Sequence, residues 1–232
     1  MIARVVVIDG PAGAGKSTVA RQLAAALGFV LLDTGALYRA LAFAAERTGI
    51  PWDDEQGMTV LAERIVAHSE LMLEPHAGGE RGVRVRLMGE DVTDAIRTPN
   101  MSMGASRVSA LPGVRLALLD LQRQLGRVPP GVVAEGRDLG TVVFPDAPVK
   151  FFLTASLEVR ARRRQNELEA KGQSPPWAKT LEEVAQRDRQ DSERPVAPLR
   201  QAPDALLVDS TGRSVEDVVA EMKSVVEDAF RG

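Results

Sequence analysis

Hydrophobic residues follow two different spacings along the chain, and the two spacings alternate. Residues 5–8 are a continuous β-branched run, typical of a strand buried on both faces of a parallel sheet. Similar runs predict four further strands, at 29–32, 132–134, 149–153 and 205–208. Helical spacing and capping residues predict helices up to Gly28, at about 37–49, 54–67, 99–109 and 112–126, after Ser156, at 180–193 and from Ser214 onward. Alternating strands and helices are typical of a doubly wound α/β sheet.

The pattern changes over about residues 65–95. Residues 83–87 alternate between an aliphatic residue and arginine, which is the period of a half-exposed strand. An apolar run at 71–73 precedes them, and Gly78 and Gly79 between the two runs predict a turn. We therefore expect a small antiparallel hairpin inserted into the main fold.

Composition limits the classes of protein that the chain can represent. Its 232 residues suit one α/β domain, and a net charge of −3 gives no bulk attraction to nucleic acid or to membranes. Cysteine is absent, which excludes disulfides and fits a reducing compartment. The sequence contains neither a signal peptide nor an apolar run of about 18 residues. We expect a cytoplasmic protein whose anion-binding sites are local clusters of arginine.

A glycine-rich segment directly follows the first predicted strand and opens the first predicted helix. It matches the P-loop pattern G-x-x-x-x-G-K-[ST] and consists of Gly10, Pro11, Ala12, Gly13, Ala14, Gly15, Lys16 and Ser17. Glycines let backbone N–H groups turn toward phosphate oxygens, Lys16 reaches the β- and γ-phosphates, and the Ser17 hydroxyl can bind Mg²⁺. The motif predicts a nucleotide-phosphate site without fixing the class of protein, although the absent guanine-recognition segment Asn-Lys-x-Asp disfavours a GTPase.

Further segments closely resemble the bacterial cytidylate kinases. One is Glu135-Gly136-Arg137-Asp138-Leu139-Gly140-Thr141-Val142-Val143-Phe144-Pro145, of which the block from Gly136 to Pro145 is the most specific. The others lie at 32–39, at 105–109 with 114–115, at 187–191 with 194 and 196–199, and at 208–211. The resemblance extends in order from residue 8 to about residue 219.

This resemblance implies the P-loop nucleoside monophosphate kinase fold and the family's reaction. ATP and Mg²⁺ would be used to phosphorylate CMP or dCMP, giving ADP and CDP or dCDP, in an enzyme that is commonly a monomer. The implied organisation is one kinase domain with a core at 1–64, 96–156 and 195–232. An insertion at about 65–95 would serve the monophosphate, and a lid would occupy about 157–194.

The chemistry of such a reaction agrees with the residue types present. The acceptor is a phosphate whose second pKa is about 6, so it needs no general base, only in-line positioning and charge neutralisation. A site rich in arginine and glycine is therefore expected, and we expect no catalytic role for His68 or His76.

The resemblance assigns residues to CMP. Arg39 and Arg137 would hold its phosphate, while Ser106, Arg115 and Asp138 would bind cytosine, because a carboxylate accepts from the N4 amino group and arginine donates to O2 and N3. The remaining expected contacts are Thr34, Tyr38, Arg187, Asp191 and Arg194. A surface ion pair is the alternative for Arg39 and Arg137, and Arg39 could also be a solvated arginine on a helix. A salt bridge with Arg137 or helix capping is the alternative for Asp138, and an i,i+4 ion pair is the alternative for Arg187 with Asp191.

The expected ATP contacts are residues 10–18, which include Thr18, together with Arg160 and Arg164 beside the loop at 172–179. These two arginines would close over ATP, or would simply form a solvated basic face. Lys16, Arg39, Arg137 and Arg187 are the expected catalytic residues, and Asp33 is expected to bind Mg²⁺ through water. Kinases for UMP, AMP or shikimate are the nearest alternatives, and a P-loop regulatory switch is an alternative from another class.

Overall fold

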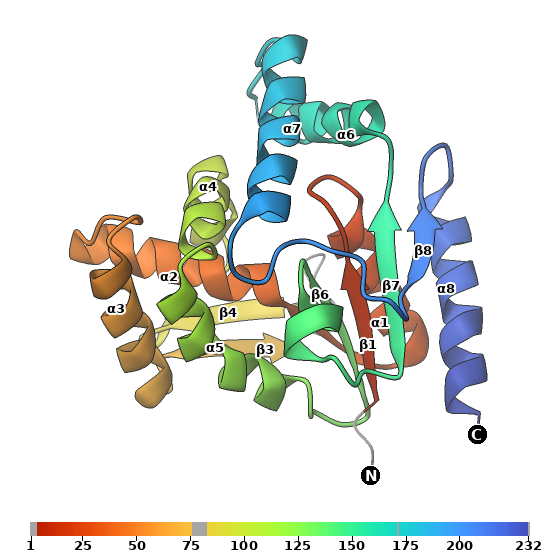
Figure 1. The fold of residues 1–232 in the computed structure, drawn as a ribbon, viewed down its shortest axis with the longest axis horizontal. Helices are drawn as coiled ribbons and strands as arrows, with labels where there is room; N and C mark the ends of the chain where they lie inside the picture. Colours follow the sequence, from red (N-terminus) through yellow and green to blue (C-terminus); the bar gives the residue numbers. More distant parts are fainter. Residues whose placement is uncertain (1–3, 76–82, 171, 232) are drawn as a thin grey trace.

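The computed structural model describes residues 4–75, 83–170 and 172–231 (Figure 1). Its elements in chain order are β1 (Val5–Asp9), α1 (Lys16–Leu27), β2 (Val30–Asp33), α2 (Thr34–Thr48), α3 (Glu55–Ala67), β3 (Leu71–Pro75), β4 (Val83–Leu87), β5 (Glu90–Asp91), η1 (Ala95–Arg97), α4 (Pro99–Val108), α5 (Pro112–Leu125), β6 (Val132–Gly136), η2 (Leu139–Val143), β7 (Val149–Thr154), α6 (Leu157–Glu169), α7 (Trp177–Glu193), β8 (Leu206–Asp209) and α8 (Val215–Phe230).

Five strands form a parallel sheet in the order β2-β6-β1-β7-β8, which confirms the predicted fold class. The β-branched run of β1 lies at the centre, with both faces buried. Val6 and Ile8 pack against α1 and α8, whereas Val5 and Val7 pack toward η2. Because β1 is central, the loop that follows it lies in the middle of the carboxyl edge of the sheet.

A second sheet contains β3, β4 and β5 and is antiparallel, as the alternating pattern predicts. Val83, Val85 and Leu87 are buried, and Arg84 and Arg86 between them are half-buried. Strand β5 was not predicted, because two residues are too few to show a periodic pattern. The predicted turn at 78–79 and His76 lie outside the described residues, and His68 caps the end of α3.

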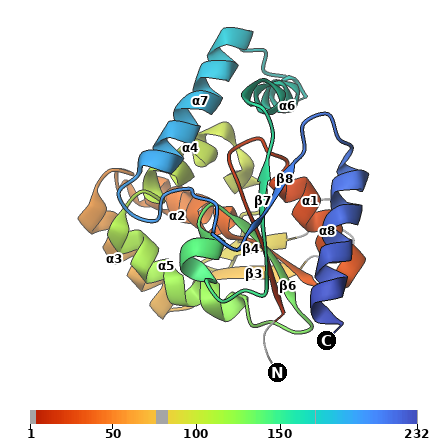
Figure 2. The ribbon, with the colours of Figure 1, turned by 45° about the vertical axis from the view of Figure 1, so that its right-hand side comes forward.

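Helices α6 and α7 form a hairpin beyond the carboxyl ends of the strands (Figures 1 and 2). Helix α7 begins at Trp177, three residues before the predicted start at 180. Arg162 stacks 4.3 Å from the Trp177 ring centre, and Gln165 donates to the Pro175 carbonyl at 3.0 Å, so contacts with α6 hold this first turn in place. Movement of this hairpin as a lid stays a prediction.

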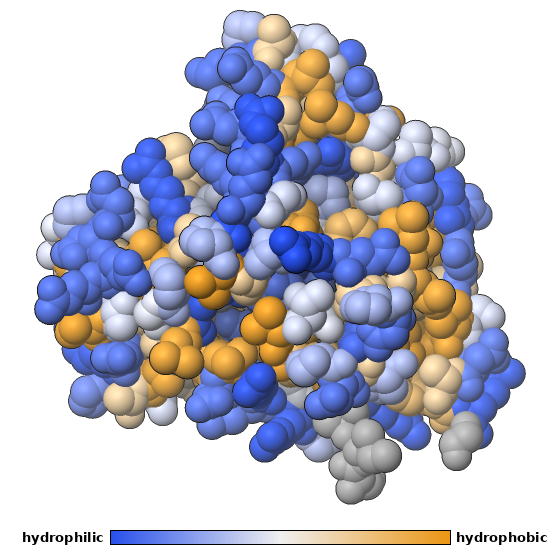
Figure 3. Space-filling model, in the orientation of Figure 1, coloured by the Kyte–Doolittle hydropathy of each residue, from blue (hydrophilic) through white to orange (hydrophobic). Residues whose placement is uncertain are grey.

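The surface facing the viewer in Figure 3 is mainly hydrophilic, with apolar residues interspersed. Leu206 and Leu207 of the edge strand β8 are 49% and 59% exposed. Within the described ranges, no helix is both long and apolar enough to cross a membrane.

Candidate active site

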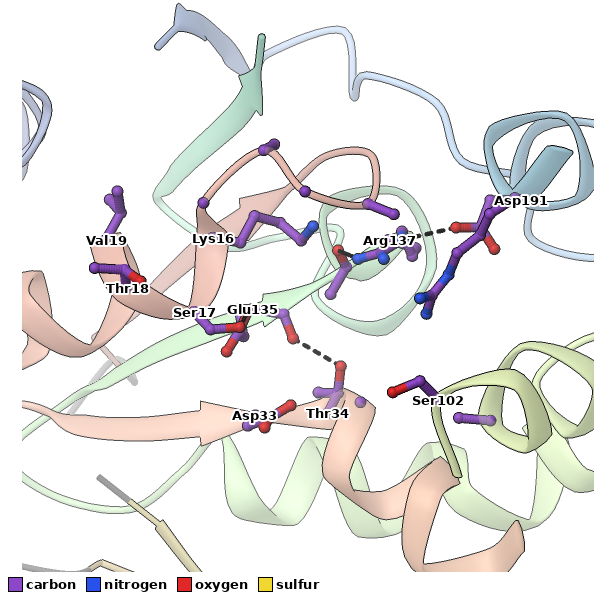
Figure 4. Close-up of a pocket in the computed structure, with 18 of the residues that line it drawn as sticks. Lys16, Ser17, Thr18, Val19, Asp33, Thr34, Ser102, Glu135, Arg137 and Asp191 are labelled. Carbon is purple, nitrogen blue, oxygen red and sulfur yellow. Dashed lines mark hydrogen bonds and ion pairs between the residues drawn. The ribbon is translucent and has the colours of Figure 1, made fainter. Parts of the chain in front are cut away.

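The P-loop connects β1 to α1 and curves around the Lys16 side chain (Figure 4). Gly10 has a φ of +152°, and a Cβ there would lie 2.0 Å from the Leu153 carbonyl oxygen, so only glycine fits. Lys16 Nζ donates to the Pro11 carbonyl at 2.8 Å. Burial lowers the pKa of Lys16, and Arg137 lowers it further. Lys16 is thus a buried cation that a bound phosphate would stabilise.

A cavity of about 520 Å³ opens beside this loop, and its lining divides into two groups. We call the first the P-loop side: Ala12, Gly13, Ala14, Gly15, Lys16, Ser17, Thr18, Val19, Arg163, Arg164, Glu167, Ser210, Arg213, Ser214, Val215 and Val218. We call the second the arginine side: Asp33, Thr34, Gly35, Tyr38, Arg39, Ser102, Ala105, Ser106, Ser109, Arg115, Glu135, Gly136, Arg137, Asp138, Arg187, Asp191 and Arg194. One cavity therefore collects nearly all the expected contacts, and Gly10, Pro11 and Arg160 lie outside its lining.

Glu135 at the end of β6 is a site residue that the sequence analysis missed. Its Oε2 accepts from Ser17 Oγ at 2.8 Å, and its Oε1 is buried without a hydrogen-bond partner among the described residues. Burial raises the pKa of Glu135 to about 7, and the neighbouring Asp33 raises it as well. The hydroxyl and carboxylate oxygens here are ligands that Mg²⁺ prefers, and a cation would offset the burial of the charge. The sequence signal was available, since Glu135 directly precedes the specific Gly136-Arg137-Asp138 block.

Asp33 and Arg39 face each other across the start of α2. Asp33 Oδ1 caps the helix by accepting from the Ala36 N–H at 3.0 Å, and its Oδ2 accepts from Arg39 at 2.6 Å. Burial alone would raise the pKa of Asp33, but Arg39 and Arg97 outweigh it and hold that pKa below its usual value. The surface alternative for Arg39 is wrong, because its side chain is 19% exposed and lines the cavity.

Asp138 lies between two arginines that come from distant parts of the chain. Its Oδ2 accepts from Arg115 of α5 in a short contact, and its Oδ1 accepts from Arg194 at 3.0 Å. Arg115 also donates to the Ser109 carbonyl and Arg194 to the Ala197 carbonyl, which fixes both guanidinium groups. The alternative of a salt bridge between Asp138 and Arg137 is wrong, because Asp138 pairs with Arg115 and Arg194 in the described structure.

Arg137 bonds instead to Asp191 of α7, at 2.9 Å between Nε and Oδ2 (Figure 4). Burial alone would raise the pKa of Asp191, but Arg137 and Arg187 reverse this and lower it. No hydrogen bond between Arg187 and Asp191 is found in the described structure, but the two charges stabilise each other, so the i,i+4 alternative holds as an electrostatic interaction without direct contact. Arg187 Nε is buried without a described partner, and burial followed by Arg137 lowers the pKa of Arg187 to about 10. The Nε of this guanidinium could donate to an anion bound in the cavity.

Thr34, Tyr38 and Ser106 of the arginine side differ in the contacts that they make. Thr34 Oγ1 donates to the Glu135 carbonyl at 2.7 Å. Tyr38 is buried, with its ring centre 5.8 Å from the Arg115 guanidinium. Ser106 lines the cavity from α4.

Arg160 and Arg164 of α6, expected together on ATP, lie in different environments. Arg164 lines the cavity and bonds to Glu167 at 3.3 Å. Arg160 is buried outside this lining and its guanidinium contacts Ala155, Ala12 and Asp188, so the solvated-face alternative is wrong for it, and its position does not favour the expected contact with ATP. Arg163, which the sequence analysis missed, lines the cavity and donates to the Ala14 carbonyl at 3.0 Å.

Asp9 ties the two sides of the cavity together. It ends β1, immediately before the P-loop, and accepts from the Leu139 and Gly140 N–H groups at 3.0 and 2.7 Å. These donors directly follow Asp138. Burial raises the pKa of Asp9 to about 6. One carboxylate therefore sets the distance between the P-loop strand and the turn that carries Arg137 and Asp138.

The sheet, the P-loop and the arginine-lined cavity define the class as a P-loop phosphotransferase with a polar acceptor site. The family model described as "Cytidylate kinase" matches residues 6–228. The cytidylate kinase of Pseudomonas aeruginosa (strain UCBPP-PA14) is 56% identical, over 91% of this chain and 90% of that protein. That of Pseudomonas syringae pv. syringae (strain B728a) is 51% identical, over 99% of this chain and 97% of that protein. The chain belongs to the cytidylate kinase family and is thus a nucleoside monophosphate kinase.

Among solved structures, a shikimate kinase from Acinetobacter baumannii in complex with shikimate covers 100% of this chain and 97% of its own. Its identity is 15% and its TM-score 0.43, so this likeness says nothing about the acceptor of the present chain.

Proposed function

We propose that the chain transfers the γ-phosphate of ATP to CMP or dCMP, with Mg²⁺, and releases ADP and CDP or dCDP. The observation that carries the proposal is Asp138, held between Arg115 and Arg194 in the same cavity as the P-loop. A fixed carboxylate flanked by guanidinium groups offers both the acceptor and the donors that the edge of cytosine requires.

ATP would bind on the P-loop side, with its phosphates against the backbone of residues 10–18. The positive end of α1 and Lys16 would stabilise the negative charge on the transferring group. Ser17 and Glu135 would hold Mg²⁺, with Asp33 acting through water, and the ion would neutralise phosphate charge. Arg163 and Arg164 line the same side and would cover the nucleotide.

CMP would bind on the arginine side. Asp138 would accept from the N4 amino group, and Arg115 with Ser106 would contact the rest of the base. Arg39 and Arg137 would hold the phosphate, and Asp191 with Arg187 and Arg194 would contact the ribose and phosphate. Thr34 and Tyr38 would form part of the wall of the CMP site.

The reaction then follows from placing two phosphates in one arginine-rich cavity. The CMP phosphate is largely ionised at neutral pH and is itself the nucleophile. Lys16, Arg137 and Arg187 would reduce the repulsion between the two anions and stabilise the charge of the in-line transition state. Arg39 would join them on exchanging its partner Asp33 for phosphate.

Three further points belong to the proposal and rest on composition and family resemblance. The enzyme works as a monomer, it resides in the cytoplasm, and it binds neither nucleic acid nor membranes. The division into a core, a monophosphate-binding insertion at about 65–95 and a moving lid at about 157–194 is proposed on the same basis.

A coupled assay of ADP release tests the acceptor directly. CMP, dCMP, UMP, AMP and shikimate would be compared with the wild-type protein, and Lys16→Ala would serve as the blank. We expect kcat/KM for CMP and dCMP to exceed that for UMP by about tenfold or more, because a buried mismatched polar group costs about 1–3 kcal/mol and tenfold corresponds to about 1.4 kcal/mol. AMP or shikimate as the best acceptor, or slow ATP hydrolysis without any acceptor effect, would refute the proposal.

A further inference from the structure

The side chain of Arg160 contacts the P-loop but does not line the cavity. It is 7% exposed, and its guanidinium meets groups from three separate segments. Nε donates to the Ala155 carbonyl at 2.9 Å, and Nη1 donates to the Ala12 carbonyl at 3.1 Å. Nη1 also lies 2.7 Å from Asp188 Oδ2 of α7. One side chain therefore joins the end of β7, the P-loop and the second helix of the α6–α7 hairpin.

The P-loop and the start of α6 also touch through their backbones. A Cβ on Gly13 would lie 2.9 Å from the Arg160 carbonyl oxygen and 3.1 Å from the Arg160 Cβ. Gly13 has a φ of +75°, a conformation that favours glycine. The loop is therefore packed directly against the residue whose side chain holds it.

The contact with Ala12 follows from how a P-loop binds phosphate. When successive N–H groups point inward to an anion, some carbonyl groups point outward and need donors of their own. Arg160 supplies one to Ala12, and Arg163 supplies another to Ala14. A guanidinium has several donors in a rigid plane, which allows it to reach three acceptors that one ammonium group cannot satisfy together.

The contact with Asp188 reaches the arginine side of the cavity. Asp188 is adjacent in α7 to Arg187, whose buried Nε has no described partner and whose side chain lines the cavity. Fixing Asp188 fixes the turn of α7 that presents Arg187. The loop that would cradle ATP and the helix that presents Arg187 are thus held by the same guanidinium.

We propose that Arg160 is a positioning residue for phosphoryl transfer, which holds the P-loop through Ala12 and α7 through Asp188 so that the phosphate cradle and Arg187 take up their places together. It touches neither substrate. The proposal rests on the proposed phosphotransferase function of the cavity. The expected change in kcat also requires CMP to be the acceptor.

The test compares Arg160→Lys with Arg189→Lys, a matched change at an exposed position of α7. We expect Arg160→Lys to lower kcat by between about tenfold and a hundredfold, since a small displacement of catalytic groups has effects of that size. KM for ATP should rise through the link to the P-loop, and KM for CMP should rise as well, because Arg160 also holds the turn of α7 that presents Arg187. Arg189→Lys should retain wild-type kinetics.

Asp188→Asn separates positioning from simple folding. It should lower kcat in the same direction as Arg160→Lys, and the double variant should lose less than the two single losses multiplied, because both act through one contact. Unfolding midpoints recorded in parallel show whether each variant is folded at the assay temperature. If folded Arg160→Lys and Asp188→Asn both keep kcat within about twofold of wild type, or if their losses multiply, the proposal is overturned.

A binding measurement keeps this test independent of the acceptor. ADP affinity, measured by calorimetry without CMP, should be weaker in Arg160→Lys than in Arg189→Lys, even if wild-type protein failed to phosphorylate CMP. Equal ADP affinities would contradict the link to the P-loop, whereas an inactive wild-type protein would contradict only the proposed acceptor.

Discussion

The two sides of the cavity are built in different ways. The P-loop side centres on one continuous segment between β1 and α1, whose backbone N–H groups can bind phosphate, and residues of α6, of the loop after β8 and of α8 complete it. The arginine side is assembled from side chains of α2, α4, α5, the end of β6 and α7. The first kind of site exists once a strand and a helix have formed, while the second exists only when distant helices have docked.

The two sides also differ in charge pairing within the described structure. On the arginine side, carboxylates already pair with arginines: Asp33 with Arg39, Asp138 with Arg115, and Asp191 with Arg137. On the P-loop side, Arg164 pairs with the exposed Glu167, but Lys16 in the described structure donates to a neutral carbonyl. A substrate must therefore share or displace ion pairs on the arginine side, whereas phosphate on the P-loop side meets a cation held by a weaker partner.

Removing the cation of the P-loop side is expected to have the largest effect. Lys16→Ala should lower kcat by about a hundredfold or more, because a lost donor to transition-state charge has effects of this size. CMP affinity, measured by calorimetry, should stay nearly unchanged, since the arginine side remains intact. Lys179→Ala, at an exposed position on α7, is the control. Activity within about threefold of wild type would contradict the P-loop assignment.

Asp9, which connects the two sides, predicts a dependence of stability on pH. The folded protein holds the Asp9 proton more strongly than the unfolded chain, because the folded pKa is about 6 against an ordinary value of 3.8. Its contribution to stability is full below about pH 4 and is lost as the pH rises through about 6. Since one pH unit corresponds to about 1.4 kcal/mol per proton, the change is on the order of 3 kcal/mol.

Urea unfolding at several pH values would measure this contribution. The free energy of unfolding of wild type minus that of Asp9→Asn should decrease between pH 4 and pH 6.5. The exposed Asp146→Asn variant should show no such slope. A difference that stays constant with pH would contradict the assigned role of burial at Asp9.

The contrast between the two sides explains what the sequence could predict. The P-loop, the buried β1 run and the alternating β4 run can each be recognised from a few residues, and the P-loop motif and the resemblance together named most of the residues that line the cavity. The partners of those residues could not be derived from spacing. Asp138 meets Arg115 and Arg194 from 23 and 56 positions away, and Ser17 meets Glu135 from 118 positions away. Such pairs depend on how α5, α7 and β6 dock in three dimensions.

Arg160 illustrates the same limit on a single helix. Its spacing from Arg164 suggested two arginines acting together, since residues four apart share one helical face. Arg160 instead packs against Gly13 of the P-loop. Its guanidinium bonds to the Ala12 carbonyl and to Asp188, and it does not line the cavity. Local spacing identifies a face of the helix but does not identify what covers it.

Asp191 provides a more moderate test on the arginine side. Asp191→Ala should reduce kcat/KM for both CMP and dCMP, because Arg137 loses its partner. The loss should be about tenfold larger for CMP if Asp191 also accepts from the ribose 2′-hydroxyl, since a hydrogen bond to a charged group contributes about 1.5–3 kcal/mol. The exposed Glu193→Ala on the same helix is the control. Equal losses for CMP and dCMP would contradict a contact between Asp191 and the 2′-hydroxyl. The role of Asp191 would then be limited to holding Arg137.

The central claim is that the Asp138 carboxylate selects cytosine, and the CMP:UMP ratio of kcat/KM in Asp138→Asn tests it most directly. An ionised carboxylate only accepts hydrogen bonds, so it suits the N4 amino group and repels the uracil carbonyl, whereas asparagine can face either base. The ratio should fall at least about tenfold from wild type, with the exposed Asp120→Asn of α5 unchanged. An unchanged ratio, with both activities reduced together, would contradict base selection and leave Asp138 as a support for Arg115 and Arg194 alone.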